Sequence, residues 1–163
     1  MDLVAEGGGV MTARPSNHRI YRPTVALELS LLLPKPADGG TYLEPGRLFL
    51  SMAAGVAREK YDWPGALRLC LAPRELGELL VGLDGAEVSI IHDPGAGTRA
   101  KGAVVKALKV KRGDDGRTMV SMGSKANGGP WASAGTIGLS PGELATVREL
   151  LRTAIPVLLG WVA

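Results

Sequence analysis

Side chains suited to acid–base or metal chemistry are scarce in this chain. Its 163 residues include two histidines and one cysteine, Cys70, which are too few for a zinc centre of His and Cys ligands. His92 and Asp93 are adjacent, and neighbours in a strand point to opposite faces, so we do not expect them to form a catalytic dyad. Asp93 followed by Pro94 predicts a turn instead. We therefore expect no catalytic residue, metal, cofactor or small-molecule substrate.

The glycine-rich segments do not match the loops that bind nucleotide phosphates. Gly95-x-Gly97 lacks the third glycine of a dinucleotide-binding loop and precedes a basic stretch rather than a helix. Gly123-Ser124-Lys125 reverses the Gly-Lys-Ser order of a P-loop. Nucleotide-dependent enzymes are therefore not expected.

Positive charge is concentrated in one segment of the chain. The formal net charge is only +3, but residues 95–117 contain two acidic residues, Asp114 and Asp115, against a larger basic set: Arg99, Lys101, Lys106, Lys109, Lys111, Arg112 and Arg117. In a strand, Lys109 and Lys111 share one face and Lys106 lies on the other. Such lysines either contact phosphates or protect an exposed strand edge, and composition leaves both open.

Aromatic residues make up only 4% of the chain. Within Lys60-Tyr61-Asp62-Trp63, we expect Tyr61 to contact an unpaired base and Trp63 to lie in the core, although either ring could serve as a stacking surface. Trp131 follows a glycine-rich stretch and is expected on a loop, against nucleic acid or a neighbouring molecule. Trp161 is expected to anchor the end of the last helix, and Cys70 to be a small packed residue.

The elements that would position these residues follow two equal blocks of four strands and a helix. Ser140 and Glu143 form a capping box, which predicts that the last helix begins at Pro141. Apolar alternation and turn residues predict strands at 24–33, around 42, and at 47–56, 66–71, 87–92, 104–111, 119–123 and 136–139, with an earlier helix from Pro73 to about Leu83. The pattern indicates an α+β fold whose helices cover the apolar sheet faces.

The N-terminal segment, residues 1–19, contains Gly7-Gly8-Gly9 and is expected to be disordered, leaving residues 20–163 as one domain. Asp2 and Glu6 argue against a transit peptide, which is poor in acidic residues. No apolar run reaches the ~20 residues that a membrane-spanning helix needs.

Four segments, in order, resemble the Whirly family of single-stranded DNA-binding proteins. They are Lys60-Tyr61-Asp62-Trp63 with Arg74-Glu75-Leu76-Gly77, Ile90-Ile91-His92-Asp93-Pro94, Val105-Lys106-Ala107-Leu108-Lys109-Val110, and the ending Ile155-Pro156-Val157-Leu158-Leu159-Gly160-Trp161. The resemblance covers roughly residues 20–161.

This resemblance implies two antiparallel four-stranded sheets packed crosswise, each followed by a helix, and a homotetramer assembled through the helices. It also implies single-stranded DNA binding with little sequence preference, a role in organelle genome maintenance, transcription or defence, and a location in plastid, mitochondrion or nucleus. The DNA-binding residues expected here are Tyr21, Arg22, Lys60, Tyr61, Lys106, Lys109 and Lys111.

One segment departs from the family pattern. Where the family carries Lys-Gly-Lys-Ala-Ala-Leu-Ser-Val, this chain has Arg22-Pro23-Thr24-Val25-Ala26-Leu27-Glu28-Leu29, so the second cation is lost and Glu28 adds negative charge. Two alternatives therefore stay open, namely a transcription-cofactor module with weakened DNA binding and an RNA-binding relative.

The last helix carries more apolar surface than one sheet can bury. Beyond its core-facing stripe, Leu150, Val157 and Leu159 extend the apolar arc. A wide exposed apolar patch usually marks an interface, so these residues are expected in the contact of a homotetramer.

Overall fold

The computed structural model describes residues 16–40, 43–95, 103–126 and 128–161. The elements in chain order are β1 (Ser16–Tyr21), β2 (Val25–Leu32), β3 (Lys35–Pro36), β4 (Leu43–Glu44), β5 (Arg47–Ala57), β6 (Lys60–Tyr61), β7 (Leu67–Leu71), α1 (Pro73–Leu83), β8 (Val88–His92), β9 (Val105–Arg112), β10 (Thr118–Lys125), β11 (Ala132–Leu139) and α2 (Pro141–Leu158).

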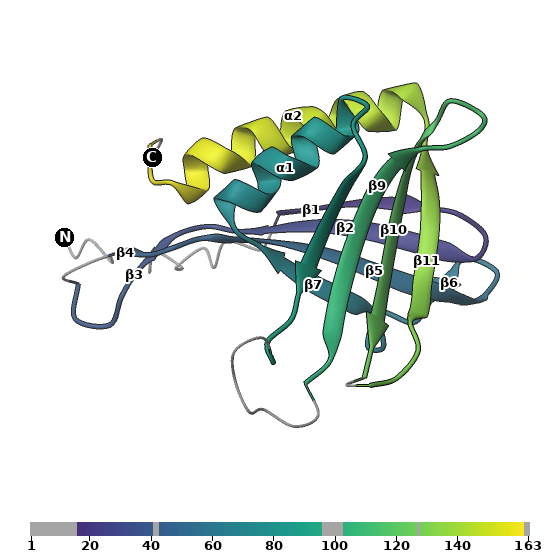
Figure 1. The fold of residues 1–163 in the computed structure, drawn as a ribbon. Helices are drawn as coiled ribbons and strands as arrows, with labels where there is room; N and C mark the ends of the chain where they lie inside the picture. The colour runs from purple at the N-terminus through teal and green to yellow at the C-terminus, as the bar shows by residue number, and fades with distance from the viewer. Residues whose placement is uncertain (1–15, 41–42, 96–102, 127, 162–163) are drawn as a thin grey trace, which may run out of the picture.

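The first sheet has the strand order β1-β2-β5-β7, and the two-residue β6 pairs with the end of β5. All of its pairs are antiparallel. Alternate residues of β2 and β5, such as Leu27, Leu29 and Leu50, are buried on its inner face. The short β3 and β4 form a separate hairpin that projects from the body of the molecule (Figure 1).

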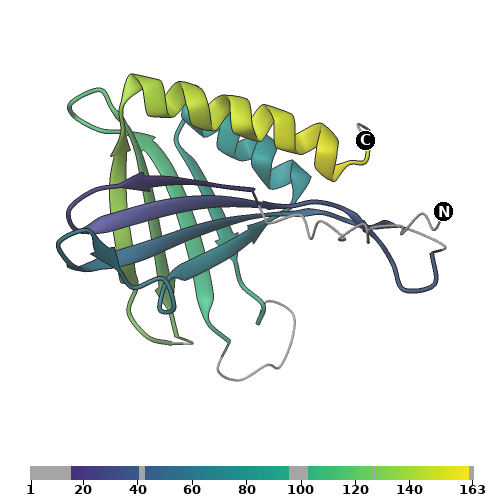
Figure 2. The same ribbon diagram turned by 180° about the vertical axis from the view of Figure 1, so that it is seen from behind.

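The second sheet is a regular antiparallel meander, β11-β10-β9-β8. Its inner face is buried at Leu108, Val110, Val120 and Ile137. The two sheets cross at a steep angle, and both helices lie side by side on one side of the crossing (Figures 1 and 2). The facing surfaces of the sheets and the helices enclose a single hydrophobic core.

Gly135 of β11 lies where the second sheet comes close to β2 and β5 of the first. It lies on β11 with φ of 146°, and a Cβ atom there would come within 2.6 Å of Val25 Cγ2 and 3.1 Å of Met52 Sδ. Only a residue without a side chain allows this approach and this backbone conformation. A side chain at position 135 would therefore push the two sheets apart at this point.

Both helices begin with a proline in their first turn. The α1 bounds agree with the sequence prediction, and Pro73 occupies its first turn. In α2 the Ser140 side chain accepts a hydrogen bond from the Glu143 amide, while Glu143 accepts one from the Ser140 amide, as a capping box does. Pro156 lies within the last turn of α2 without ending the helix before Leu158.

The fold prediction, two four-stranded antiparallel sheets each followed by a helix, is confirmed, but its first strand was wrong. Residues 16–19, expected to be disordered, belong to β1, which pairs with β2 along its whole length. The short strand expected around residue 42 is instead a two-residue pairing, and Tyr42 itself lies outside the described residues, as do residues 1–15. The sequence Ser16–Tyr21 has no apolar alternation, so its extended conformation comes from pairing with β2.

Three further expectations are corrected. Cys70 is exposed because it alternates with Leu69 and Leu71, which point into the core. Trp63 is half-buried on the outer face of the first sheet rather than in the core. Trp161 is 79% exposed and does not anchor the helix. In the described ranges, no helix is long and apolar enough to cross a membrane.

Candidate nucleic-acid interface

Three aromatic rings gather on the outer face of the first sheet, where β1 ends at Tyr21 and β6 ends at Tyr61. Tyr21 and Tyr61 have ring centroids 5.2 Å apart, and Tyr61 and Trp63 have centroids 6.4 Å apart. Tyr21 is 48% exposed. We call these three residues the aromatic cluster. Exposed or half-exposed rings on a sheet can stack against unpaired bases.

Arg19 lies over this cluster and is neutralised there. Its guanidinium carbon is 4.5 Å from the centroid of Trp63, and its Nε donates to Glu28 Oε2 at 2.5 Å. The hydrogen bond to Glu28, followed by one to Tyr21, raises the pKa of Arg19. Glu28 comes from β2, opposite Arg19 in the strand register, and is only 5% exposed. A buried carboxylate requires such a cation partner.

Arg22 connects the turn between β1 and β2 to the start of α2. Its two terminal nitrogens donate to Glu143 at 2.6 and 3.0 Å and to the Gly138 carbonyl at 2.8 Å. This contact lowers the pKa of Glu143 to about 2. The Tyr61 hydroxyl donates to the Arg22 carbonyl at 2.6 Å. Arg22 thus holds sheet, helix and aromatic cluster together, and its charge is neutralised within the chain.

The outer face of the second sheet carries lysines instead. Lys109 and Lys111 are exposed on β9, on the face opposite the core, as the sequence predicted. Lys125 of β10 lies 5.1 Å from the centroid of the Trp131 ring, which is 51% exposed. Within the described part of the chain, none of these three lysines has a carboxylate at ion-pair distance.

A groove of about 470 Å³ runs beside these lysines. Its walls are apolar at Ile91, Ala107 and Trp131, and Lys109 lines it together with the serines Ser89, Ser121 and Ser133. Ile91 is 58% exposed. An apolar groove bordered by a cation suits a nucleotide, whose base is planar and apolar on its faces and whose phosphate is anionic.

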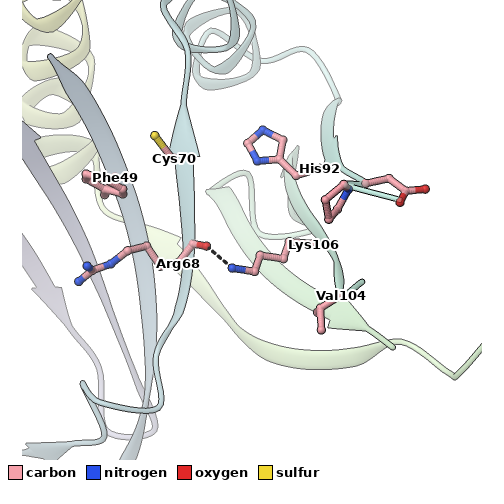
Figure 3. A pocket seen from close by; sticks show the side chains of 8 residues that line it. Phe49, Arg68, Cys70, His92, Val104 and Lys106 are labelled. Carbon is pink, nitrogen blue, oxygen red and sulfur yellow. Dashed lines mark hydrogen bonds between the residues drawn. The ribbon is translucent and has the colours of Figure 1, made fainter. Parts of the chain in front are cut away.

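Lys106 occupies a different place from the other two lysines of its strand. It lies on the inner face of β9, and its Nζ donates to the Arg68 carbonyl at 2.9 Å, across to the edge strand β7 of the first sheet (Figure 3). Around this bridge is a depression of about 600 Å³ lined by Phe49, Arg68, Cys70, His92, Asp93, Pro94, Val104 and Lys106. Lys106 therefore links β9 to the edge strand of the first sheet. Protection of an exposed edge of their own strand, one of the two roles that the sequence left open for these lysines, does not apply, because β9 lies between β8 and β10.

Further contacts of Arg68, His92 and Asp93 lie around this depression. The Arg68 guanidinium lies 5.5 Å from the centroid of the Phe49 ring and donates to Ser51 Oγ at 3.1 Å. His92 Nε2 is 2.6 Å from Glu75 Oε1 of α1. Asp93 accepts a hydrogen bond from the Gly95 amide, which confirms the predicted turn. Asp93 thus holds the turn, whereas His92 contacts α1.

The seven predicted binding residues fall into two groups. Tyr21, Lys60, Tyr61, Lys109 and Lys111 have side chains at least partly open to solvent, and Arg22 and Lys106 are committed to contacts within the chain. Contact of any of them with nucleic acid stays a prediction. Arg99 and Lys101 of the basic segment lie outside the described residues.

Arg19 and Arg68 were not identified from the sequence as residues of the candidate interface, and Trp63 was not placed in the aromatic cluster. Arg19 fell in the segment assigned to disorder, so no strand register was available to place it opposite Glu28. Arg68 had a usable signal, because it alternates with Leu67 and Leu69 and must point away from the core.

The predicted interface residues of α2 lie away from the core. Leu150 is 41% and Leu159 is 46% exposed, and Val157 is half-buried. The core-facing stripe is buried at Val147, Leu151 and Leu158. Across the described residues, no three His, Cys, Asp or Glu side chains gather as metal ligands would.

Known proteins are similar to this chain in both sequence and fold. The family model described as Whirly transcription factor matches residues 20–150. The mitochondrial single-stranded DNA-binding protein WHY2 of Arabidopsis thaliana is 24% identical, over 94% of this chain and 68% of its own length.

Solved structures agree with the topology. WHY1 of Arabidopsis thaliana superposes with a TM-score of 0.77 at 26% identity, covering 93% of this chain and 89% of its own. The plant transcriptional regulator PBF-2 superposes with a TM-score of 0.78 at 25% identity, covering 93% and 86%.

Proposed function

Because the chain belongs to the Whirly family, we propose that it binds single-stranded DNA, with little sequence preference, on the outer faces of its two sheets. The family consists of DNA-binding proteins rather than enzymes. A strand would stack bases on the aromatic cluster of the first sheet and place phosphates against Lys109 and Lys111 of the second.

The observation that carries this proposal is the pairing of exposed rings with lysines that lack a carboxylate partner, on two faces of one rigid core. Both faces are open, and single strands bind such surfaces by stacking and backbone charge rather than by reading base edges. Affinity should therefore fall steeply with salt and change little with sequence.

A fluorescence polarisation titration with single-stranded DNA, duplex DNA and RNA of equal length tests the proposal. We expect the single-stranded DNA to bind more tightly than the duplex. Equal binding of duplex and single strand would remove the single-strand assignment. Tighter binding of RNA would support the RNA-binding alternative, and no binding at low salt would favour the transcription-cofactor module.

We further propose a homotetramer assembled through α2. Leu150, Val157 and Leu159 offer an apolar surface that the chain itself leaves partly open, and cyclic symmetry would point the sheets outward. Light scattering tests this, because a 17.0 kDa chain that stays monomeric at micromolar concentration contradicts it. Leu150→Glu with Val157→Glu should give smaller species that bind short strands less tightly, whereas an intact tetramer would move the interface elsewhere.

For the biological role, we propose genome maintenance in plastid or mitochondrion, or regulation of transcription and defence from the nucleus. The relative WHY2 is described as mitochondrial, which supports an organelle. Imaging of a fluorescent fusion decides among the three compartments.

A further inference from the structure

One ring of the aromatic cluster already has an occupant. The Arg19 guanidinium lies 4.5 Å from the centroid of Trp63, over its ring. An arginine in this position is attracted to the π-electrons of the indole. A nucleobase would stack on the same surface, so base and guanidinium compete for it.

Glu28 fixes that occupant in place. It holds Arg19 Nε at 2.5 Å, and Asn17 Nδ2 approaches the same carboxylate oxygen at 3.4 Å. Glu28 is 5% exposed at the centre of the outer face, between β1 and β5, where its partner Ser51 in the register is fully buried. Because the buried Glu28 carboxylate requires a cation, moving Arg19 away from Glu28 and Trp63 would leave a buried charge without its partner.

The Arg19–Glu28 pair also reduces the electrostatic attraction of this part of the sheet for a phosphate. The charges of Arg19 and Glu28 cancel, so the pair adds no net attraction for a polyanion. The other two rings differ, because Tyr21 and Tyr61 have no guanidinium stacked on them in the described structure. Two of the three rings, Tyr21 and Tyr61, are therefore open for stacking with bases.

We propose that Glu28 is a positioning residue which, by seating Arg19 on Trp63, closes that ring to bases and directs stacking to Tyr21 and Tyr61. This inference rests on the proposed function. Glu28 thereby lowers the affinity of the first sheet for single strands below what its aromatic content would allow.

Trp63 fluorescence reports the closed ring directly. All variants are made in a Trp131→Phe, Trp161→Phe background, where Trp63 is the sole tryptophan. In the free protein we expect Glu28→Gln to make Trp63 about twofold more accessible to acrylamide, since Gln keeps the shape of Glu but holds Arg19 more weakly. On titration with oligothymidylate, Trp63 should be quenched strongly in Glu28→Gln and little when Glu28 is intact.

Two further variants separate ring opening from charge. Arg19→Lys preserves the net charge but lacks the planar group that stacks, so it should also open Trp63 to quenching and tighten binding about threefold. Glu87→Gln removes a carboxylate in the exposed turn before β8, and it should leave Trp63 quenching unchanged. Circular dichroism confirms that each variant is folded.

Each outcome has a separate meaning. Equal quenching of Trp63 by oligothymidylate with Glu28 intact and in Arg19→Lys overturns the inference while leaving single-strand binding in place. Unchanged acrylamide quenching in Glu28→Gln and Arg19→Lys overturns it without any reference to DNA. Absence of a fluorescence polarisation change when the unchanged protein, with all three tryptophans, is titrated with oligothymidylate instead removes the proposed function.

Discussion

The outer faces of the two sheets differ in their aromatic content and in how many of their cations are paired with a carboxylate. On the first sheet, Arg19 and Arg22 are each paired with a carboxylate of the chain, Glu28 and Glu143. On the second, Lys109 and Lys111 stand without such a partner among the described residues. The first face therefore offers three clustered rings beside paired arginines, with Arg68 as a cation that has no carboxylate at ion-pair distance among the described residues. The second face offers unpaired lysines beside a single ring, Trp131. Counting cations in the sequence would rate both faces alike.

Removing the free charge of the second sheet should have the largest effect on binding. Lys109→Gln with Lys111→Gln is expected to lower affinity for single-stranded DNA about thirtyfold at low salt and to reduce the slope of log K against log salt by about 1.4, as two lost phosphate contacts would. Polarisation titrations at several salt concentrations measure both quantities.

Lys106→Gln is the matched control, because this lysine lies on the same strand and donates to the Arg68 carbonyl instead. Its salt slope should stay near that of the unchanged protein. A slope reduction of about 0.7, half that of the double variant, would mean that the inward-facing Lys106 also contacts a DNA phosphate.

Removing a ring from the first sheet should have a smaller effect of a different kind. Tyr61→Ala is expected to weaken binding about tenfold through lost stacking, with the salt slope unchanged. Tyr61→Phe keeps the ring and loses only the hydrogen bond to the Arg22 carbonyl, so its affinity should stay close to the original. A reduced salt slope in Tyr61→Ala would show that the two faces do not divide stacking and charge as described.

The smallest expected effect is on stability, and it tests whether Arg22 is committed to the fold. The pKa of Glu143 falls from its ordinary 4.5 to about 2, so the ion pair stabilises the protein fully above pH 4.5, and this contribution is lost as the pH falls toward 2. Because both side chains are partly exposed, we expect Glu143→Gln to cost about 1–2 kcal/mol at pH 7 and almost nothing near pH 2.

Urea unfolding at several pH values measures this difference. Gln at this position can keep the capping contact to the Ser140 amide, so the change isolates the ion pair. Glu149→Gln, on the exposed side of α2, should show no such pH-dependent difference. A constant cost of Glu143→Gln at all pH values would assign Glu143 to capping alone.

Local pattern in the sequence was sufficient for most of the elements. Pro73 and the apolar spacing after it gave the bounds of α1, and alternation placed Lys109 and Lys111 on one face. β1 could not be found in this way, because Ser16–Tyr21 is held extended by its partner strand rather than by its own residues. Long-range pairing of this kind has no local signal.

The site was predictable in composition but not in electrostatic state. Arg22 and Glu143 are 121 positions apart, and nothing in either neighbourhood indicates that they meet. Glu28 was expected to add negative charge, but the structure neutralises it with Arg19. Whether a charged residue is free depends on the tertiary register, which single-sequence patterns do not contain.

Gly135 allows β11 of the second sheet to pack closely against Val25 and Met52 of the first sheet. A methyl group there would meet Val25 and Met52 of the other sheet, so a substitution would shift one sheet relative to the other from a position on the inner face, away from both outer faces. A DNA single strand that contacts both outer faces must bend through the angle between the sheets. It must also be long enough to reach from the aromatic cluster to the lysines. A change in the angle between the sheets would alter the distance between the aromatic cluster and the lysines of the second sheet without changing any of those side chains. A search for functional positions confined to the surface would pass over the residue that sets this geometry.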